Sequence, residues 1–115
     1  MENKNNEIEK SKSHSIVNLI GYATDVVVSI ALLKKVTGSI TLMSFVPGKV
    51  LAQKTTPFDT FVQIIDGAAE IIIGDEAHQL ESGEGIIIPA HEAYCFNAKK
   101  KFKLISTVIK SGYEE

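Results

Sequence analysis

The residues of this chain that could do chemistry are few and lie far apart in the sequence. Three histidines, His14, His78 and His91, are its imidazole groups, and Cys95 is its single thiol. A zinc or iron site needs several imidazole, thiolate or carboxylate ligands that converge at about 2.0–2.3 Å. Histidines scattered in this way do not form a cluster. One cysteine can form neither an internal disulfide nor a cysteine-based zinc site.

The basic residues argue against a nucleic-acid partner. All twelve are lysines, and the formal net charge is −2. A nucleic-acid surface needs a concentrated basic stripe that displaces counterions from phosphates. Without arginine, the chain also lacks the bidentate fork that recognises phosphate or guanine. We therefore expect no nucleic-acid partner.

The apolar stretches are too short for a membrane span. The longest, residues 26–33, falls far below the roughly 20 residues that cross a bilayer. The first fourteen residues have mixed charge and no apolar core, unlike a secretory signal. A single cysteine is typical of a reducing compartment. We predict a soluble, cytoplasmic protein without membrane contact.

The elements that must position these residues are predicted to be strands. Valine and isoleucine dominate the apolar residues and favour a pleated surface. Turn signals recur about every 8–12 residues, which favours an all-β sandwich or barrel over βαβ units. The predicted strands are residues 26–35, 39–46, 49–54, 60–66, 68–73, 77–80, 86–88, 93–98 and 102–110.

Glycines and a serine mark the turns around these strands. Gly38 is expected at a positive-φ position of a hairpin, and Gly67 between two strands. Ser15 is expected to cap a short helical turn over residues 16–20. We predict a disordered polar lead over residues 1–14 and one barrel domain over residues 15–115.

Residues 26–109 resemble small single-domain cupins of the conserved-barrel type. The resemblance rests on five segments, PG at 47–48, TPFD at 56–59, VQIIDGAAEIIIG at 62–74, LESG at 80–83 and IIIPA at 86–90. It implies a cupin-type double-stranded β-helix, or jelly-roll barrel, with a pocket among inward-facing side chains near one mouth. It also implies a homodimer.

The first motif of that family spaces its ligands as G-x5-H-x-H-x3-E-x6-G. Anchored at Gly48 and Gly67, it fits this chain without a gap. The two histidine positions are then Lys54 and Thr56, and the glutamate position is Thr60.

The second motif, G-x5-P-x-G-x2-H, anchors at Gly83 and Pro89. It places His91 at the next glycine position and Tyr94 at the final histidine position. All four metal-ligand positions of the family are therefore replaced, and the resemblance implies no strong metal site here. An ammonium repels a metal cation, and threonine hydroxyls are weak ligands.

We therefore predict a metal-independent small-molecule binding or sensing protein without a cofactor. Its ligand would lie in the barrel around Lys54, Thr56, Thr60 and Tyr94, with Lys54 and Tyr94 facing each other across the pocket. If Thr60 faces inward, period-two alternation places Val62 inward too, with residues 61 and 63 facing outward.

Three alternatives remain open. The protein could be a metal-free lyase or isomerase that uses Lys54 as nucleophile or base and Tyr94 as acid. It could be a weak metalloenzyme that recruits His91. It could also be a structural dimer whose barrel is filled by its own side chains, in which case Lys54 reaches solvent and Tyr94 fills space.

Overall fold

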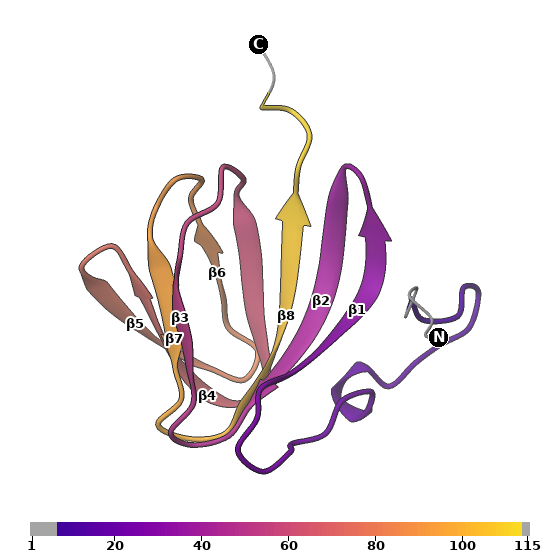
Figure 1. Cartoon of the computed structure of the whole chain (residues 1–115). Coiled ribbons are helices and arrows are strands. Elements are labelled where there is room, and N and C mark those ends of the chain that lie inside the picture. The colour runs from indigo at the N-terminus through magenta and orange to yellow at the C-terminus, as the bar shows by residue number, and fades with distance from the viewer. Residues whose placement is uncertain (1–6, 114–115) are drawn as a thin grey trace.

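Alternating apolar and polar residues fold into antiparallel strands that curl around one core (Figure 1). The computed structural model describes residues 7–113. Within them the strands are β1 (Val28–Lys35), β2 (Gly38–Phe45), β3 (Val50–Lys54), β4 (Thr60–Ile73), β5 (Glu76–Glu81), β6 (Gly85–Ile88), β7 (Tyr94–Asn97) and β8 (Phe102–Ile109). The predicted all-β barrel is confirmed.

The strands form two facing sheets that share β4. The first sheet consists of β1, β2, β8, β6 and the first part of β4, and the second sheet consists of the rest of β4 with β3, β5 and β7. Their hydrogen-bonded order is β1-β2-β8-β4-β7-β3, and β5 and β6 each pair with β4. The first part of β4 pairs with β8 and β6, whereas its second part pairs with β7 and β5. All pairings are antiparallel, as a jelly-roll barrel requires.

The predicted break of the chain at Gly67 is wrong. β4 runs through this residue without interruption, and the register with β8 shifts between Ile64 and Asp66. Gly67 has a φ of 79°, and a Cβ atom there would overlap the Lys101 carbonyl oxygen. The bulge and the glycine let one strand bend from one sheet into the other, instead of ending it.

Two predicted turn roles also differ in the structure. Gly38 lies within β2 and outside the positive-φ region, but a Cβ there would lie 2.7 Å from the Val108 carbonyl oxygen, so close strand approach explains it. The helical turn is a 3-10 turn, η1 (Ile16–Asn18), and Ser15 makes no side-chain cap. Its hydroxyl accepts a hydrogen bond from the Asn18 side chain instead. Among the described residues, no helix is long and apolar enough to cross a membrane.

The main core fills the space between the sheets. Phe45 stacks on Phe102 at 4.6 Å between ring centroids and meets Phe96 edge-on at 5.8 Å. Thr60 and Val62 are buried, whereas Phe61 between them is 43% exposed, so the predicted alternation along β4 is confirmed. The buried apolar residues of this core are Phe45, Val62, Ile64, Ala69, Ile71, Leu80, Ile88, Phe96, Ala98, Phe102 and Leu104.

A second core lies on the outer face of the first sheet, under residues 7–27, which we call the N-terminal arm. Ile20 of the arm is buried with Leu32 and Leu42 of the sheet. The backbone N–H of Ile8 donates to the Leu32 carbonyl oxygen at 3.1 Å. Residues 7–14 of the predicted disordered lead therefore contact the barrel, and residues 1–6 lie outside the described residues.

Tyr22 anchors the arm at the bend of β4. Its hydroxyl donates to the Asp66 carboxylate, and the ammonium groups of Lys101 and Lys103 lie 4.8 and 5.1 Å from its ring centroid. Lys103, which is buried, also donates to the Val17 carbonyl oxygen at 2.7 Å. Burial, with the Asp66 hydrogen bond and charge, raises the Tyr22 pKa well above its ordinary value.

We expect this anchor to weaken at alkaline pH. Because the folded-state pKa of Tyr22 exceeds its unfolded value near 10, its contribution to stability is complete below about pH 10 and is lost as pH rises above it. The free energy of unfolding should therefore fall more steeply above pH 10 in the wild type than in Tyr22→Phe. Urea denaturation between about pH 8 and 11 measures both slopes. The lysines titrate in both proteins, so only Tyr22 should make the slopes differ. Equal slopes would therefore contradict the role of Tyr22 as the anchor.

Candidate functional site

Lys54 and Tyr94 are direct neighbours in one sheet. They are cross-strand partners in the β3–β7 pair, after a register irregularity between Leu51 and Lys54. Side chains directly opposite each other in this way have Cβ atoms roughly 5 Å apart. The two residues therefore lie together, but side by side in one sheet. The prediction that they face each other across the pocket is wrong.

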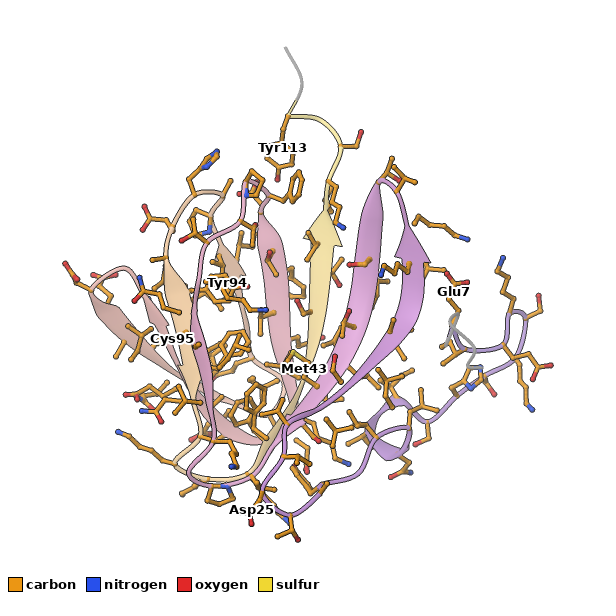
Figure 2. The ribbon with its side chains drawn as sticks, in the orientation of Figure 1. Glu7, Asp25, Met43, Tyr94, Cys95 and Tyr113 are labelled. Atoms are coloured by element: carbon orange, nitrogen blue, oxygen red, sulfur yellow. The ribbon has the colours of Figure 1, made fainter. Side chains whose placement is uncertain are left out.

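The two side chains have different surroundings. Tyr94 is half-buried, packs against the main core and lies 5.6 Å from the Phe96 ring centroid. Figure 2 shows Tyr94 and Met43 directed into the space between the sheets. Burial raises the pKa of the Tyr94 phenol, so its hydroxyl keeps its proton at neutral pH and can donate a hydrogen bond. Lys54 is exposed, which leaves its ammonium at the edge of the barrel.

The two threonines differ in their availability. Thr60 is 3% exposed and lies on the inner face of the other sheet, at the start of β4. The Thr56 hydroxyl is engaged in a local turn, where it accepts from the Phe58 N–H at 3.0 Å and donates to the Phe58 carbonyl oxygen at 2.9 Å. Of the two threonines, Thr60 is therefore the one that faces the interior of the barrel.

These residues do not fit a metal ion. Lys54 presents a positive charge, and the Thr56 hydroxyl is engaged with backbone groups. His91 is exposed, on the loop between β6 and β7. Across residues 7–113, no three histidine, cysteine, aspartate or glutamate side chains come close enough together to hold a metal. No catalytic step through a metal can be derived from this donor set.

The backbone nevertheless follows the aligned motifs. The four positions that they assign to glycine all have positive φ, with 91° at Gly48, 79° at Gly67, 93° at Gly83 and 71° at His91. The His91 N–H also donates to the Thr56 carbonyl oxygen at 2.7 Å, which joins the two loops at the mouth. A non-glycine residue in this region costs about 1–3 kcal/mol.

Replacement of His91 by glycine should therefore stabilise the protein by about 1 kcal/mol. The backbone bond to Thr56 is unchanged, and the strain on the Cβ atom disappears. Chemical denaturation of His91→Gly against the wild type measures the gain, and His91→Ala, which keeps a Cβ atom, should not show it. A loss of stability in His91→Gly would mean that the imidazole makes favourable contacts that outweigh the strain.

Asp59 joins three segments at the mouth. Its N–H donates to the Tyr113 hydroxyl at 2.7 Å, and its carboxylate accepts from the Ala90 N–H at 2.8 Å. The rings of Phe58 and Tyr113 pack edge-on at 5.7 Å. These partners lie far along the chain from Asp59. No local pattern in the sequence marks such a contact.

Open cavities lie elsewhere on the molecule. Four of them, with volumes of about 230 to 530 Å³, occur between strands, loops and the N-terminal arm. Lys54, Thr56, Thr60 and Tyr94 line none of these four. A ligand at these residues would therefore sit at the mouth of the barrel, above its filled core.

Comparison with known proteins shows which solved structures share this fold. No family model matches the chain, and no curated protein matches it. A conserved protein of unknown function from Streptococcus pyogenes is 27% identical, with a TM-score of 0.87 over 93% of this chain and 94% of that one. A cupin superfamily protein from Desulfitobacterium hafniense is 25% identical, with a TM-score of 0.83 over 90% of this chain and 94% of that one.

A more distant similarity extends to an enzyme. Salicylate 1,2-dioxygenase from Pseudoaminobacter salicylatoxidans is 19% identical, with a TM-score of 0.68, and the match covers 72% of this chain and 26% of that one. At this identity the similarity concerns the fold alone. The barrel, its motif glycines and these structures together identify a small cupin-fold protein.

Proposed function

We propose that this cupin-fold protein binds or senses a small molecule at the mouth of its barrel, without a metal ion. The observation that carries the proposal is the register pairing of Lys54 with Tyr94, a charged amine beside a half-buried phenol. Both groups donate hydrogen bonds, so together they suit a ligand oxygen with negative charge. Thr60 adds a hydroxyl from the facing sheet.

An apolar surface beside these donors would receive the rest of the ligand. Met43 and Ile86 are partly buried and pack against the main core. A few polar groups above an apolar floor are the usual composition of a small-molecule site. The proposed ligand is therefore an acid with a compact apolar body.

The enzyme alternatives have less support. A nucleophilic lysine requires burial that strips its hydration, and Lys54 is exposed. A metalloenzyme that recruits His91 would need further ligands, and residues 7–113 contain no cluster that supplies them. The filled structural barrel is the second candidate, and the close stacking of Phe45 on Phe102 favours it.

Thermal shift with a panel of small carboxylic acids tests the proposal. An acid that binds the folded protein at a hundred times its Kd should add about 2.7 kcal/mol to the free energy of unfolding and raise Tm. Lys54→Met and Tyr94→Phe should each reduce that shift. Lys100→Met, which removes a lysine from the β7–β8 loop, should leave it unchanged.

Two results would contradict this function. If no acid raises Tm, or if the shift survives in the double variant Lys54→Met/Tyr94→Phe, the ligand does not use these donors and the filled structural barrel is preferred. Stoichiometric transition metal in protein purified without added metal would contradict the metal-independent site.

We also propose that the protein forms a homodimer through the outer face of the first sheet. Ile87 and Phe61 are cross-strand partners that are 62% and 43% exposed, and Thr107 pairs with Phe61 on the other side. Ile109, at 57% exposure, follows Thr107 on the same face. An exposed apolar patch, bordered by Lys35 across Gly38 from Ile109, suits a two-fold contact in which the same patch meets itself.

The double variant Phe61→Glu/Ile87→Glu should therefore be monomeric under conditions where the wild type is a dimer, because four carboxylates would meet in a symmetric contact. Sedimentation velocity measures the mass, and circular dichroism shows that the variant is folded. Val36→Glu is the control, since Val36 is 93% exposed at a hairpin tip. A monomeric wild type, or a dimeric double variant, would contradict the proposed interface.

A further inference from the structure

A groove separates the N-terminal arm from the outer side of the β1–β2 hairpin. Its volume is about 260 Å³. Its floor is apolar and consists of Ile8 from the arm with Leu32, Leu33 and Ile40 from the two strands. Leu32 is 6% exposed, whereas Leu33 at the lip is 37% exposed. An apolar group that enters the groove would therefore cover the part of the Leu33 side chain that water now contacts.

The rim of the groove is basic. Lys10, Lys12 and His14 line it, with Glu9 as the acidic residue of the lining. The Lys12 ammonium lies 3.5 Å from the Glu9 carboxylate, and the His14 ring nitrogen Nε2 lies 2.9 Å from the Glu9 carbonyl oxygen. Lys10 therefore adds positive charge beyond the Lys12–Glu9 pair, and the rim attracts an anion.

The arm is hydrogen-bonded to the barrel on both sides of this stretch. At one end, Glu7 accepts a hydrogen bond from the Lys34 N–H at 2.9 Å, next to the backbone bond of Ile8. At the other end, the Val17 carbonyl oxygen accepts from Lys103. Between them the arm turns at Ser11, whose φ is 59°. The groove thus lies beside a stretch of the arm that is held to the barrel at Glu7, Ile8 and Val17.

The volume limits the size of the occupant. At about 260 Å³, the groove has room for a short apolar chain with its head group at the rim. This size suits a small free molecule better than the long acyl chains of a membrane lipid.

We propose that this groove binds a small anionic amphiphile, a free molecule with an unbranched or aryl apolar body and a carboxylate head. The body would lie on Leu33 and Ile40, and the head would meet Lys10 and Lys12. This site is separate from the mouth of the barrel, and it does not depend on the function proposed there.

Methyl NMR of the full chain with octanoate, below its micelle-forming concentration, tests the proposal. Octanoate should shift the methyl signals of Ile8, Leu33 and Ile40 in a saturable way. The Met43 methyl group reports on the barrel at the same time, because Met43 packs against the main core. Octylammonium, which has the same body and the opposite charge, should bind at least about fivefold more weakly.

Variants separate the contribution of the rim from that of the floor. Lys10→Glu/Lys12→Glu should weaken octanoate about five- to tenfold, since two attractive charges become repulsive. Lys99→Glu/Lys100→Glu, on a distant loop, is the charge-matched control and should bind like the wild type. Leu33→Gln should weaken octanoate and octylammonium alike, and Val36→Gln on the neighbouring hairpin tip should weaken neither.

The proposal fails if octanoate shifts Met43 and leaves the three groove reporters unchanged, because the acid then occupies the barrel. It also fails if octylammonium binds as tightly as octanoate, or if Lys10→Glu/Lys12→Glu binds octanoate like the wild type. These results leave the barrel site untouched, because that site is tested by Lys54 and Tyr94 variants. The spectra of each variant also report whether it is folded.

Discussion

The bend of β4 is the constraint on which the rest of the structure depends. One strand supplies hydrogen-bonding edges to both sheets, so the barrel closes only if the strand turns without ending. Gly67 permits this turn, since its φ is positive and a side chain there would overlap the backbone at Lys101. The Tyr22–Asp66 bond fastens the N-terminal arm at the same place. Closure of the barrel and attachment of the arm therefore share one local geometry.

The candidate site takes its position from this strand. β4 begins with Thr60 on the inner face of one sheet, and Ile73 at its other end pairs with Tyr94 in the facing sheet. Tyr94 in turn is aligned with Lys54. A shift of one residue in either pairing would turn the phenol or the hydroxyl outward. The chemistry at the mouth therefore depends on strand register more than on any loop.

Much of this fold could be predicted from local pattern, and the site only in part. Alternation along β4 predicted which of Thr60, Phe61 and Val62 face inward, because side-chain direction in a strand has a period of two. The motif spacing located four glycine positions, and all four have positive φ in the structure, whereas the positive φ predicted at Gly38 was wrong. The contact of Asp59 with Tyr113 could not be predicted, since it joins segments that only the closed barrel brings together. For the same reason, the predicted placement of Lys54 and Tyr94 on opposite sides of the pocket was wrong, since the two residues pair in one sheet.

Fold and metal chemistry are separable in this barrel because they impose different demands on the chain. Positions 48, 67, 83 and 91 must adopt positive φ, and even His91 accepts that strain. The ligand positions carry no such backbone demand, so a lysine, two threonines and a tyrosine stand there while the strands still pair. The hydroxyl of Thr56 now stabilises its own loop, and Tyr94 packs on the core. Side chains at the aligned ligand positions thus take part in the packing of the barrel, and the exposed Lys54 extends toward solvent.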